Sequence, residues 1–211
     1  LRRLVTEFSS FARLPQASLE RGDLLQFLQE QLERLRRLEA EEGGGSAVAS
    51  PIELTTDLPA TPAPVFLDRQ MLGRALVNLV RNAAEAGHQR GQELVHVRLR
   101  VTRHDDLWVL DIDDDGPGIP EELLSVVFDP YMTTKRSGTG LGLAIVEKII
   151  VEHGGSILAE RSDLGGARLR VSIPAAGTPA SRVALEARDP KLPPPSRRTW
   201  GGGEHATEPR A

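Results

Sequence analysis

The chain has 211 residues, 39% of them hydrophobic and only 4% aromatic, which is enough apolar material for one domain with appendages. The formal net charge of −4 argues against a nucleic-acid-binding surface, and the absence of cysteine excludes disulfides and thiolate metal sites. No apolar run approaches the ~18 residues of a membrane span. Because the chain starts at Leu1 without a signal peptide, we expect it to be a fragment of a longer protein.

Two helices are predicted before residue 42. The first has apolar residues at i, i+3, i+4 and i+7 and ends near Pro15. Its apolar residues are Leu1, Leu4, Val5 and Phe8. The chain breaks at Arg21-Gly22, and Asp23 then caps a second helix that runs into a flexible connector at residues 43–46. The apolar face of this second helix consists of Leu24, Leu28, Leu32 and Leu35.

A strand and a long helix are predicted next. Ile52 and Leu54 alternate with polar residues, which favours a short strand. Residues 57–64 are rich in proline and predict a loop. Asp68 then caps a helix that we expect to cover residues 69–87 and to end at the glycine in its last position.

A hairpin, a long loop and a fourth helix follow. Alternating residues predict strands at 94–102 and 107–112, joined by a turn at 104–106. Residues 113–140 are rich in Gly, Pro, Asp and Thr without a regular period, so we expect mostly loop. Residues 141–153 predict a helix that two consecutive glycines end.

The last predicted element is a second hairpin. Its strands cover about 156–161 and 167–173 around Gly165-Gly166, and a Pro- and Gly-rich tail that we expect to be disordered follows from residue 176. The order of elements lacks a regular βαβ alternation. It predicts an α/β (α+β) sandwich, a mixed β-sheet with helices packed on one face.

A column of polar side chains on the helix at 69–87 is the first candidate site. At 100° per residue, Asn78, Asn82 and Glu85 fall within a narrow arc beside the apolar stripe of the same helix. One face of this helix therefore packs while a neighbouring face offers carboxamides and a carboxylate. Taken alone, such an arc is more typical of a solvated helix face than of a ligand site.

Asp114, Gly116, Gly118 and Ile119 form a second candidate site directly after a predicted strand. Glycines let the backbone approach a flat ligand, and a carboxylate at a strand end can accept a hydrogen bond from an exocyclic amine. The same residues are also common in ordinary turns, which is the more frequent explanation for each motif by itself.

A third motif, Gly138, Gly140 and Gly142, leads into the helix predicted at 141–153. Backbone N–H groups at a helix N-terminus after glycines form a cradle for anions such as phosphates. The G-x-G-x-G spacing differs from a dinucleotide loop, which needs G-x-G-x-x-G straight after a strand. No Walker loop is present in the sequence.

The motifs occur in the order of the N, G1, F and G2 boxes of the GHKL ATP-binding superfamily, which they resemble: Asn-x-x-x-Asn, D-x-G-x-G, F-x-P and G-x-G-L-G-L. Within this superfamily, the sequence is most similar to the sensor histidine kinases. The resemblance covers about residues 23–174, includes Gly165-Gly166 as a further glycine box and implies the Bergerat-type fold. Residues 4–15 are similar to a helix of nitrogen-regulation sensor kinases. The resemblance implies the end of a dimerisation and phosphotransfer hairpin at 1–16, an ATP-binding catalytic domain at 17–175 and a disordered tail at 176–211.

The resemblance also assigns ATP and Mg²⁺ to particular residues. Asn82 is implied to coordinate Mg²⁺ through its amide oxygen, Asn78 to support the phosphates and Asp114 to accept a hydrogen bond from the adenine amine. Phe128 to Arg136 are implied to form a mobile lid that carries Lys135 as a phosphate contact. The residues implied to bind ATP are Asn78, Asn82, Glu85, Asp114, Gly116, Gly118, Ile119, Phe128, Thr133, Thr134, Lys135, Gly138, Thr139, Gly140, Leu141, Gly142 and Leu143.

The implied function is transfer of the γ-phosphate of ATP to a histidine in two-component signalling. Implied partners are a histidine-containing hairpin of the same parent protein, a response regulator and a second copy in the full-length homodimer. The implied location is the cytoplasm, and the parent protein is a candidate for anchoring in the inner membrane. No histidine here lies in the His-acid-x-x-Asn-Pro setting of the acceptor, so we expect the chain not to phosphorylate itself. We interpret all five, His88, His96, His104, His153 and His205, as solvent-facing or loop residues.

Two other functions are compatible with parts of this pattern. GHKL ATP hydrolases resemble the same fold but place a glutamate where Asn78 stands, and Asn cannot act as a general base. Glu85 shares that helix face but lies about two turns away. A non-enzymatic nucleotide-binding module that regulates by dimerising is the other alternative, against which the intact Asn82, Asp114 and glycine set argue.

Overall fold

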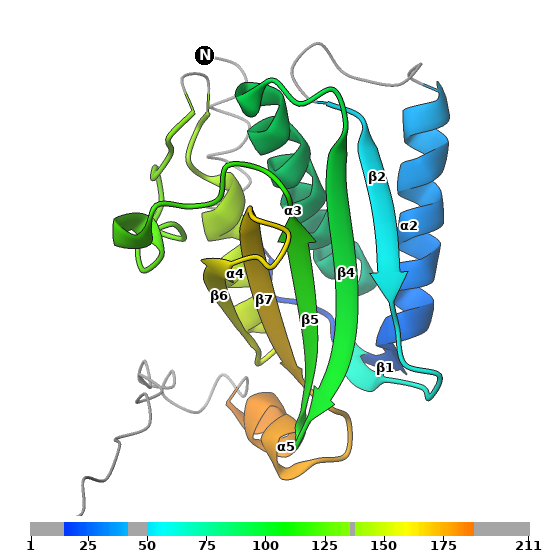
Figure 1. The fold of residues 1–211 in the computed structure, drawn as a ribbon. Coiled ribbons are helices and arrows are strands. Elements are labelled where there is room, and N and C mark those ends of the chain that lie inside the picture. Colours follow the sequence, from blue (N-terminus) through cyan, green and yellow to red (C-terminus); the bar gives the residue numbers. More distant parts are fainter. Residues whose placement is uncertain (1–14, 42–49, 136–137, 188–211) are drawn as a thin grey trace, which may run out of the picture.

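The computed structural model describes residues 15–41, 50–135 and 138–187, and its centre is a five-stranded sheet (Figure 1). The strand order is β2-β4-β5-β7-β6. The strands are β2 (Ile52–Asp57), β4 (Val95–His104), β5 (Leu107–Asp114), β6 (Ser156–Arg161) and β7 (Ala167–Pro174). β2 pairs with β4 in parallel and the remaining neighbours are antiparallel, which confirms the predicted mixed sheet.

Three helices, α2 (Leu24–Glu41), α3 (Arg69–Arg90) and α4 (Gly142–Glu152), lie on the same face of this sheet (Figure 1). Their apolar sides and the inward side chains of the strands form one core. Each fully buried Leu, Ile or Val of this core contributes about 1.5–3 kcal/mol. Among the helices within the described ranges, none is long and apolar enough to cross a membrane.

The start of α3 matches its prediction and its end does not. Asp68 caps the helix by accepting hydrogen bonds from Gln70 N and Met71 N at 3.0 Å. Gly87 does not end the helix but packs so tightly on β4 that a Cβ there would lie 2.1 Å from Val95 Cγ2. The helix ends instead at Gly91, whose φ of 82° is left-handed.

Two short strands were not predicted. β1 (Glu20–Asp23) pairs antiparallel with β3 (Pro64–Leu67), and Arg21-Gly22, where we predicted a break, lies within β1. Neither segment shows the alternation of apolar and polar residues that predicts a strand. Each strand has only four residues, and its pairing partner lies about forty residues away in the chain. The contact between these two strands therefore decides their conformation.

The predicted disorder from residue 176 is wrong for the first part of the tail. Residues Pro179–Glu186 form helix α5, which Thr178 caps by accepting from Ser181 N at 3.3 Å, with Pro179 at the first helical position. α5 packs beside the end of α4, since a Cβ at Gly154 would lie 2.3 Å from Ala184 Cβ. The rest of the tail (188–211) and the predicted hairpin helix at 1–14 lie outside the described residues.

His153 is buried, with 3% of its surface exposed, so the interpretation of this histidine as solvent-facing is wrong. It follows α4, where its Nδ1 lies 2.7 Å from Ile149 O and its Nε2 accepts from Asp68 N at 3.0 Å. The imidazole therefore ties the end of α4 to the residue that caps α3. His88, His96 and His104 are exposed as expected, and His205 lies outside the described residues.

We expect His153→Ala to lower the free energy of unfolding by about 1–3 kcal/mol, because Asp68 N–H loses its hydrogen-bond acceptor next to a helix cap. Chemical denaturation of the whole chain measures this difference. His104→Ala is the matched control, and its change should stay within about 0.5 kcal/mol because His104 is exposed. Equal midpoints for the two variants would contradict this role of His153.

Candidate functional site

A cavity of about 180 Å³ opens between α3, the end of β5, the segment 117–140 and the start of α4. It collects most of the residues that the sequence motifs singled out. The predicted residues that line it are Asn82, Glu85, Asp114, Gly118, Ile119, Thr133, Thr134, Lys135, Gly138, Thr139, Gly140, Gly142 and Leu143. Three motifs, each of which is only a weak indication of a ligand site by itself, thus meet at this cavity.

Asp114 lies at the last position of β5 and faces the cavity, although its surface is only 8% exposed. Its Oδ1 accepts from Gly116 N at 2.9 Å and from Ala167 N at 3.0 Å. Burial raises the pKa of this carboxyl, against the lowering effect of these two backbone hydrogen bonds. Within the part of the chain that the structure describes, no hydrogen bond reaches Oδ2, which is thus the acceptor available to a ligand.

The glycines around Asp114 permit a close backbone approach. Gly118 has a left-handed φ of 77°, and a Cβ there would lie 3.3 Å from Gly166 O. Gly116 does not line the cavity; its N–H donates to Asp114, and a Cβ there would lie 3.5 Å from Ala86 Cβ and 3.6 Å from Gly87 N of α3. These glycines therefore bring three backbone segments together around one carboxylate.

The polar face of α3 supplies the opposite end of the cavity. Asn82 and Glu85 line it, whereas Asn78, one turn earlier, does not and lies beside the start of α4, where a Cβ at Gly142 would be 4.0 Å from its Oδ1. The Nζ of Lys135 donates to Asn82 Oδ1 at 3.2 Å and to Glu85 Oε2 at 2.6 Å. The amide oxygen of Asn82 therefore already faces a cation, which fits its implied role as a ligand of Mg²⁺.

Residues 128–135 and 138–140 lie at this end of the cavity, and a backbone hydrogen bond joins these two stretches. Tyr131 N donates to Gly140 O at 2.9 Å, and Gly140 has a φ of 68° with a place for Cβ only 2.3 Å from Tyr131 C. Phe128 does not line the cavity but is buried in the core, so it anchors the start of the segment. Arg136, which we assigned to the lid, lies outside the described residues.

The start of α4 offers backbone donors to the cavity. Gly142 and Leu143, in its first turn, both line the cavity, and no side chain caps the helix at Leu141. Leu141 itself is buried in the core. Uncapped first-turn N–H groups together with the helix dipole favour an anion at this position.

Much of the cavity wall was not predicted. The additional lining residues are Leu79, Arg81, Ala83, Ala86, Gln89, Ile112, Pro117, Pro120, Leu123, Val127, Ala167 and Leu169, and Met132 belongs to the segment that we assigned to the lid. Strand alternation could have indicated Ile112, which lies two residues before Asp114 on the same face. The others belong to the core pattern or to the loop, including the 3₁₀ turn η1 (Glu121–Leu123), and only folding brings them here.

The chemistry of the cavity differs between its two ends. One end has apolar walls and a single recessed carboxylate, which suits a flat base that donates a hydrogen bond. The other end has a carboxamide, a lysine and the start of a helix, which suit phosphates together with a hard cation. The cavity thus has the donor and acceptor arrangement of a nucleoside polyphosphate site.

Comparison with known proteins adds independent findings. Residues 67–177 match the family described as histidine kinase-, DNA gyrase B-, and HSP90-like ATPase. The nitrogen regulation protein NtrY of Azorhizobium caulinodans is 37% identical over 84% of this chain, and the sensory histidine kinase/phosphatase NtrB of Rhodobacter capsulatus is 34% identical over 65%. The chain spans 22% of the length of NtrY and 41% of the length of NtrB.

Solved structures of the histidine kinase ThkA are also similar. Its catalytic domain superimposes with a TM-score of 0.62 at 29% identity, covering 75% of this chain and 97% of that one. ThkA in complex with the response regulator protein TrrA superimposes with a TM-score of 0.65 at 25% identity, covering 83% of this chain and 48% of that one. The likeness to the isolated catalytic domain extends over nearly all of that domain.

Proposed function

The chain belongs to the histidine kinase-, DNA gyrase B- and HSP90-like ATPases as the ATP-binding catalytic domain of a sensor histidine kinase, and on that premise we propose that it transfers the γ-phosphate of ATP to a histidine on a separate helical hairpin. The observation that carries this proposal is the cavity with a carboxylate at one end and phosphate-binding groups at the other. The proposed ATP-binding domain covers residues 17–175.

Each end of the cavity has a role in the proposed complex. Asp114 Oδ2 accepts from the adenine amine, while Gly118 and Ile119 lie against the base. Asn82 would hold Mg²⁺ through its amide oxygen, and Lys135, whose Nζ binds that oxygen in the structure, would then bind the phosphates. When bound, Mg²⁺ neutralises phosphate charge, and the first-turn N–H groups of α4 bind the remaining phosphate oxygens.

Phosphoryl transfer requires an acceptor in line with the γ-phosphate. The cavity residues within the described ranges include no histidine, and the buried His153 is held by Asp68 N. We therefore place the acceptor on the dimerisation hairpin of the parent protein, which would act as a homodimer. A response regulator is the proposed next recipient, as the complex of ThkA with TrrA supports.

The decisive experiment combines binding and transfer. Calorimetry should detect binding of ATP to the 211-residue chain, with higher affinity when Mg²⁺ is present. With γ-labelled ATP the chain alone should stay unlabelled, and a separately prepared hairpin that carries the acceptor histidine should acquire acid-labile, base-stable label. A hairpin with that histidine replaced by Gln is the control.

Other outcomes would favour other functions. Steady release of phosphate without any acceptor would indicate an ATP hydrolase, although the carboxylate of Glu85, which lines the cavity, is already paired with Lys135 and Arg81. ATP binding with neither transfer nor hydrolysis would indicate a regulatory nucleotide-binding module. No saturable binding at millimolar ATP would contradict all three.

A further inference from the structure

Asp113 precedes Asp114 in β5, and strand alternation points its side chain to the opposite face of the sheet. Within the described residues no helix lies on that face (Figure 1), yet the side chain of Asp113 is 0% exposed. Arginines of β4 and β7 and a serine after β6 enclose it. Its Oδ1 accepts from Ser162 Oγ at 2.9 Å and Arg168 Nε at 2.8 Å, and its Oδ2 from Arg98 at 3.3 Å.

Ser162 connects this buried carboxylate to the turn between β6 and β7. While its Oγ donates to Asp113, the same oxygen accepts from Leu164 N at 3.0 Å. Ser162 N donates to Gly166 O at 2.9 Å, and Gly165 N donates to Ser162 O at 3.0 Å. The Ser162 hydroxyl, which donates to Asp113, therefore holds this turn together with two backbone hydrogen bonds.

The same turn fixes the carboxylate that faces the cavity. Gly166 N donates to Asp114 O at 3.1 Å, and Ala167 N donates to Asp114 Oδ1 at 3.0 Å. The approach leaves no room, because a Cβ at Gly166 would lie 2.1 Å from Asp114 Oδ1. The two hydrogen bonds therefore couple the position of Asp114 to the position of this turn.

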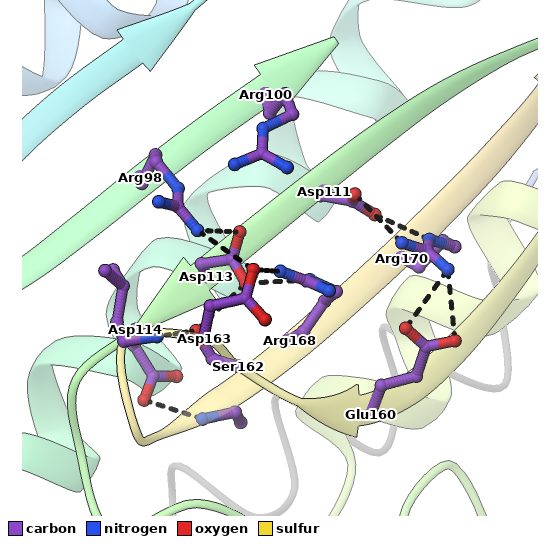
Figure 2. Close-up of polar contacts among 12 residues, drawn as sticks. Arg98, Arg100, Asp111, Asp113, Asp114, Glu160, Ser162, Asp163, Arg168 and Arg170 are labelled. Atoms are coloured by element: carbon purple, nitrogen blue, oxygen red, sulfur yellow. Dashed lines mark hydrogen bonds and ion pairs between the residues drawn. The ribbon is translucent and has the colours of Figure 1, made fainter. Parts of the chain in front are cut away.

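We infer that Asp113 is a positioning residue for nucleotide selection, which holds Asp114 in place through Ser162 and the 162–166 turn without touching the nucleotide. The inference rests on the proposed function, since it concerns how the ATP site recognises its base. Arg168 supports the same carboxylate and is itself held by Asp163 at 2.7 Å (Figure 2). Charge on one face of the sheet thus determines hydrogen-bond geometry on the other.

Asp111 provides a matched control in the same strand. It lies two residues earlier on the same face, is nearly as buried, and binds Arg170 with both carboxylate oxygens at 2.8 and 3.1 Å. Arg170 also donates a hydrogen bond to Glu160 (Figure 2). Asp111 has the same chemistry as Asp113 but no hydrogen bond to the 162–166 turn among those that the structure describes.

The experiment measures the dissociation constants of ATP and GTP for the 211-residue chain and its variants, together with their thermal stability. Asp113→Asn should reduce the preference for ATP over GTP by roughly threefold to tenfold, because residues of one hydrogen-bond network are coupled. Asp111→Asn should leave the preference unchanged, even where it lowers the melting temperature. Ser162→Ala should reduce the preference for ATP as Asp113→Asn does. It replaces Asp113→Asn in the experiment if that variant does not fold.

A double-mutant cycle separates positioning from general stability. In an Asp114→Asn background, Asp113→Asn should have no further effect on the ATP to GTP ratio. Equal losses of ATP and GTP affinity in Asp113→Asn, or an equal shift of the ratio in Asp111→Asn, would overturn the inference. A wild-type chain that binds neither nucleotide, or does not prefer ATP, would instead overturn the proposed function on which the inference rests.

Discussion

Replacing Asp114 by Asn is expected to weaken ATP binding about tenfold to a hundredfold, because a charge-assisted hydrogen bond contributes about 1.5–3 kcal/mol. The Asn side chain can keep its Oδ1 as acceptor for Gly116 N and Ala167 N, so the local fold is retained. Its amide group then presents a donor where Asp114 Oδ2 presents an acceptor. Calorimetry with ATP and GTP measures the change.

Discrimination between bases should change together with affinity. A donor at this position repels the adenine amine but can bind the carbonyl that guanine carries there, so the ATP to GTP ratio should fall. Asp115→Asn is the control, because its side chain binds His96 N at 3.0 Å and does not line the cavity. Unchanged ATP affinity in Asp114→Asn would mean that this carboxylate only shapes the turn.

The pH dependence of the wild type follows from the raised pKa of Asp114. Protonation replaces the free acceptor at Oδ2 by a hydroxyl donor and removes the charge-assisted hydrogen bond, so ATP affinity should be full above this pKa and fall as the pH is lowered through it. The Asn variant lacks the titrating group and should show a smaller loss over the same interval. Titrations of both proteins at several pH values give this comparison.

The second large effect is expected for Asn82→Ala. This change removes the amide oxygen that faces the cavity and binds Lys135. Because a bound metal ion contributes several kcal/mol to phosphoryl transfer, labelling of a supplied hairpin should fall about a thousandfold. In addition, the ratio of ATP affinities with and without Mg²⁺ should approach one, which is a readout independent of catalysis.

Asn82→Asp is the matched variant, because it keeps an oxygen at the same position and should retain the response to Mg²⁺. Asn78→Ala is a second comparison. Asn78 was assigned to the phosphates from the sequence, but it does not line the cavity. A response to Mg²⁺ that persists in Asn82→Ala would contradict the assignment of the ion to this side chain.

The nucleotide site was predictable where regular structure sets the direction of side chains. Helical periodicity placed Asn82 and Glu85 on one face of α3, and both line the cavity. Position after a strand placed Asp114 at the end of β5. Asn78 belongs to the same arc but lies one turn too early to reach the cavity, because the position of the lid and of α4 along α3 is set by packing.

Glycine motifs required the tertiary structure for their interpretation. We predicted that Gly87 ends α3, but it packs against Val95 of β4 within the helix, and the helix ends at Gly91. His153 lies four residues after Ile149 and three after Ile150, which are both buried, so the helical period could have indicated its burial. It is buried because the end of α4 meets the start of α3, a contact between residues 85 positions apart.

The sequence by itself determined the order of helices and strands of the central sheet, the amphipathic faces and the three motifs that meet at the cavity, because these depend on the 3.6- and 2-residue periods and on local capping. Only the tertiary structure decided the pairing of β1 with β3, the contact of Lys135 with Asn82 and Glu85, and the enclosure of Asp113 behind Asp114. These features join residues that are distant in the chain. Their energies come from close packing and from desolvated charge pairs, which no local pattern encodes.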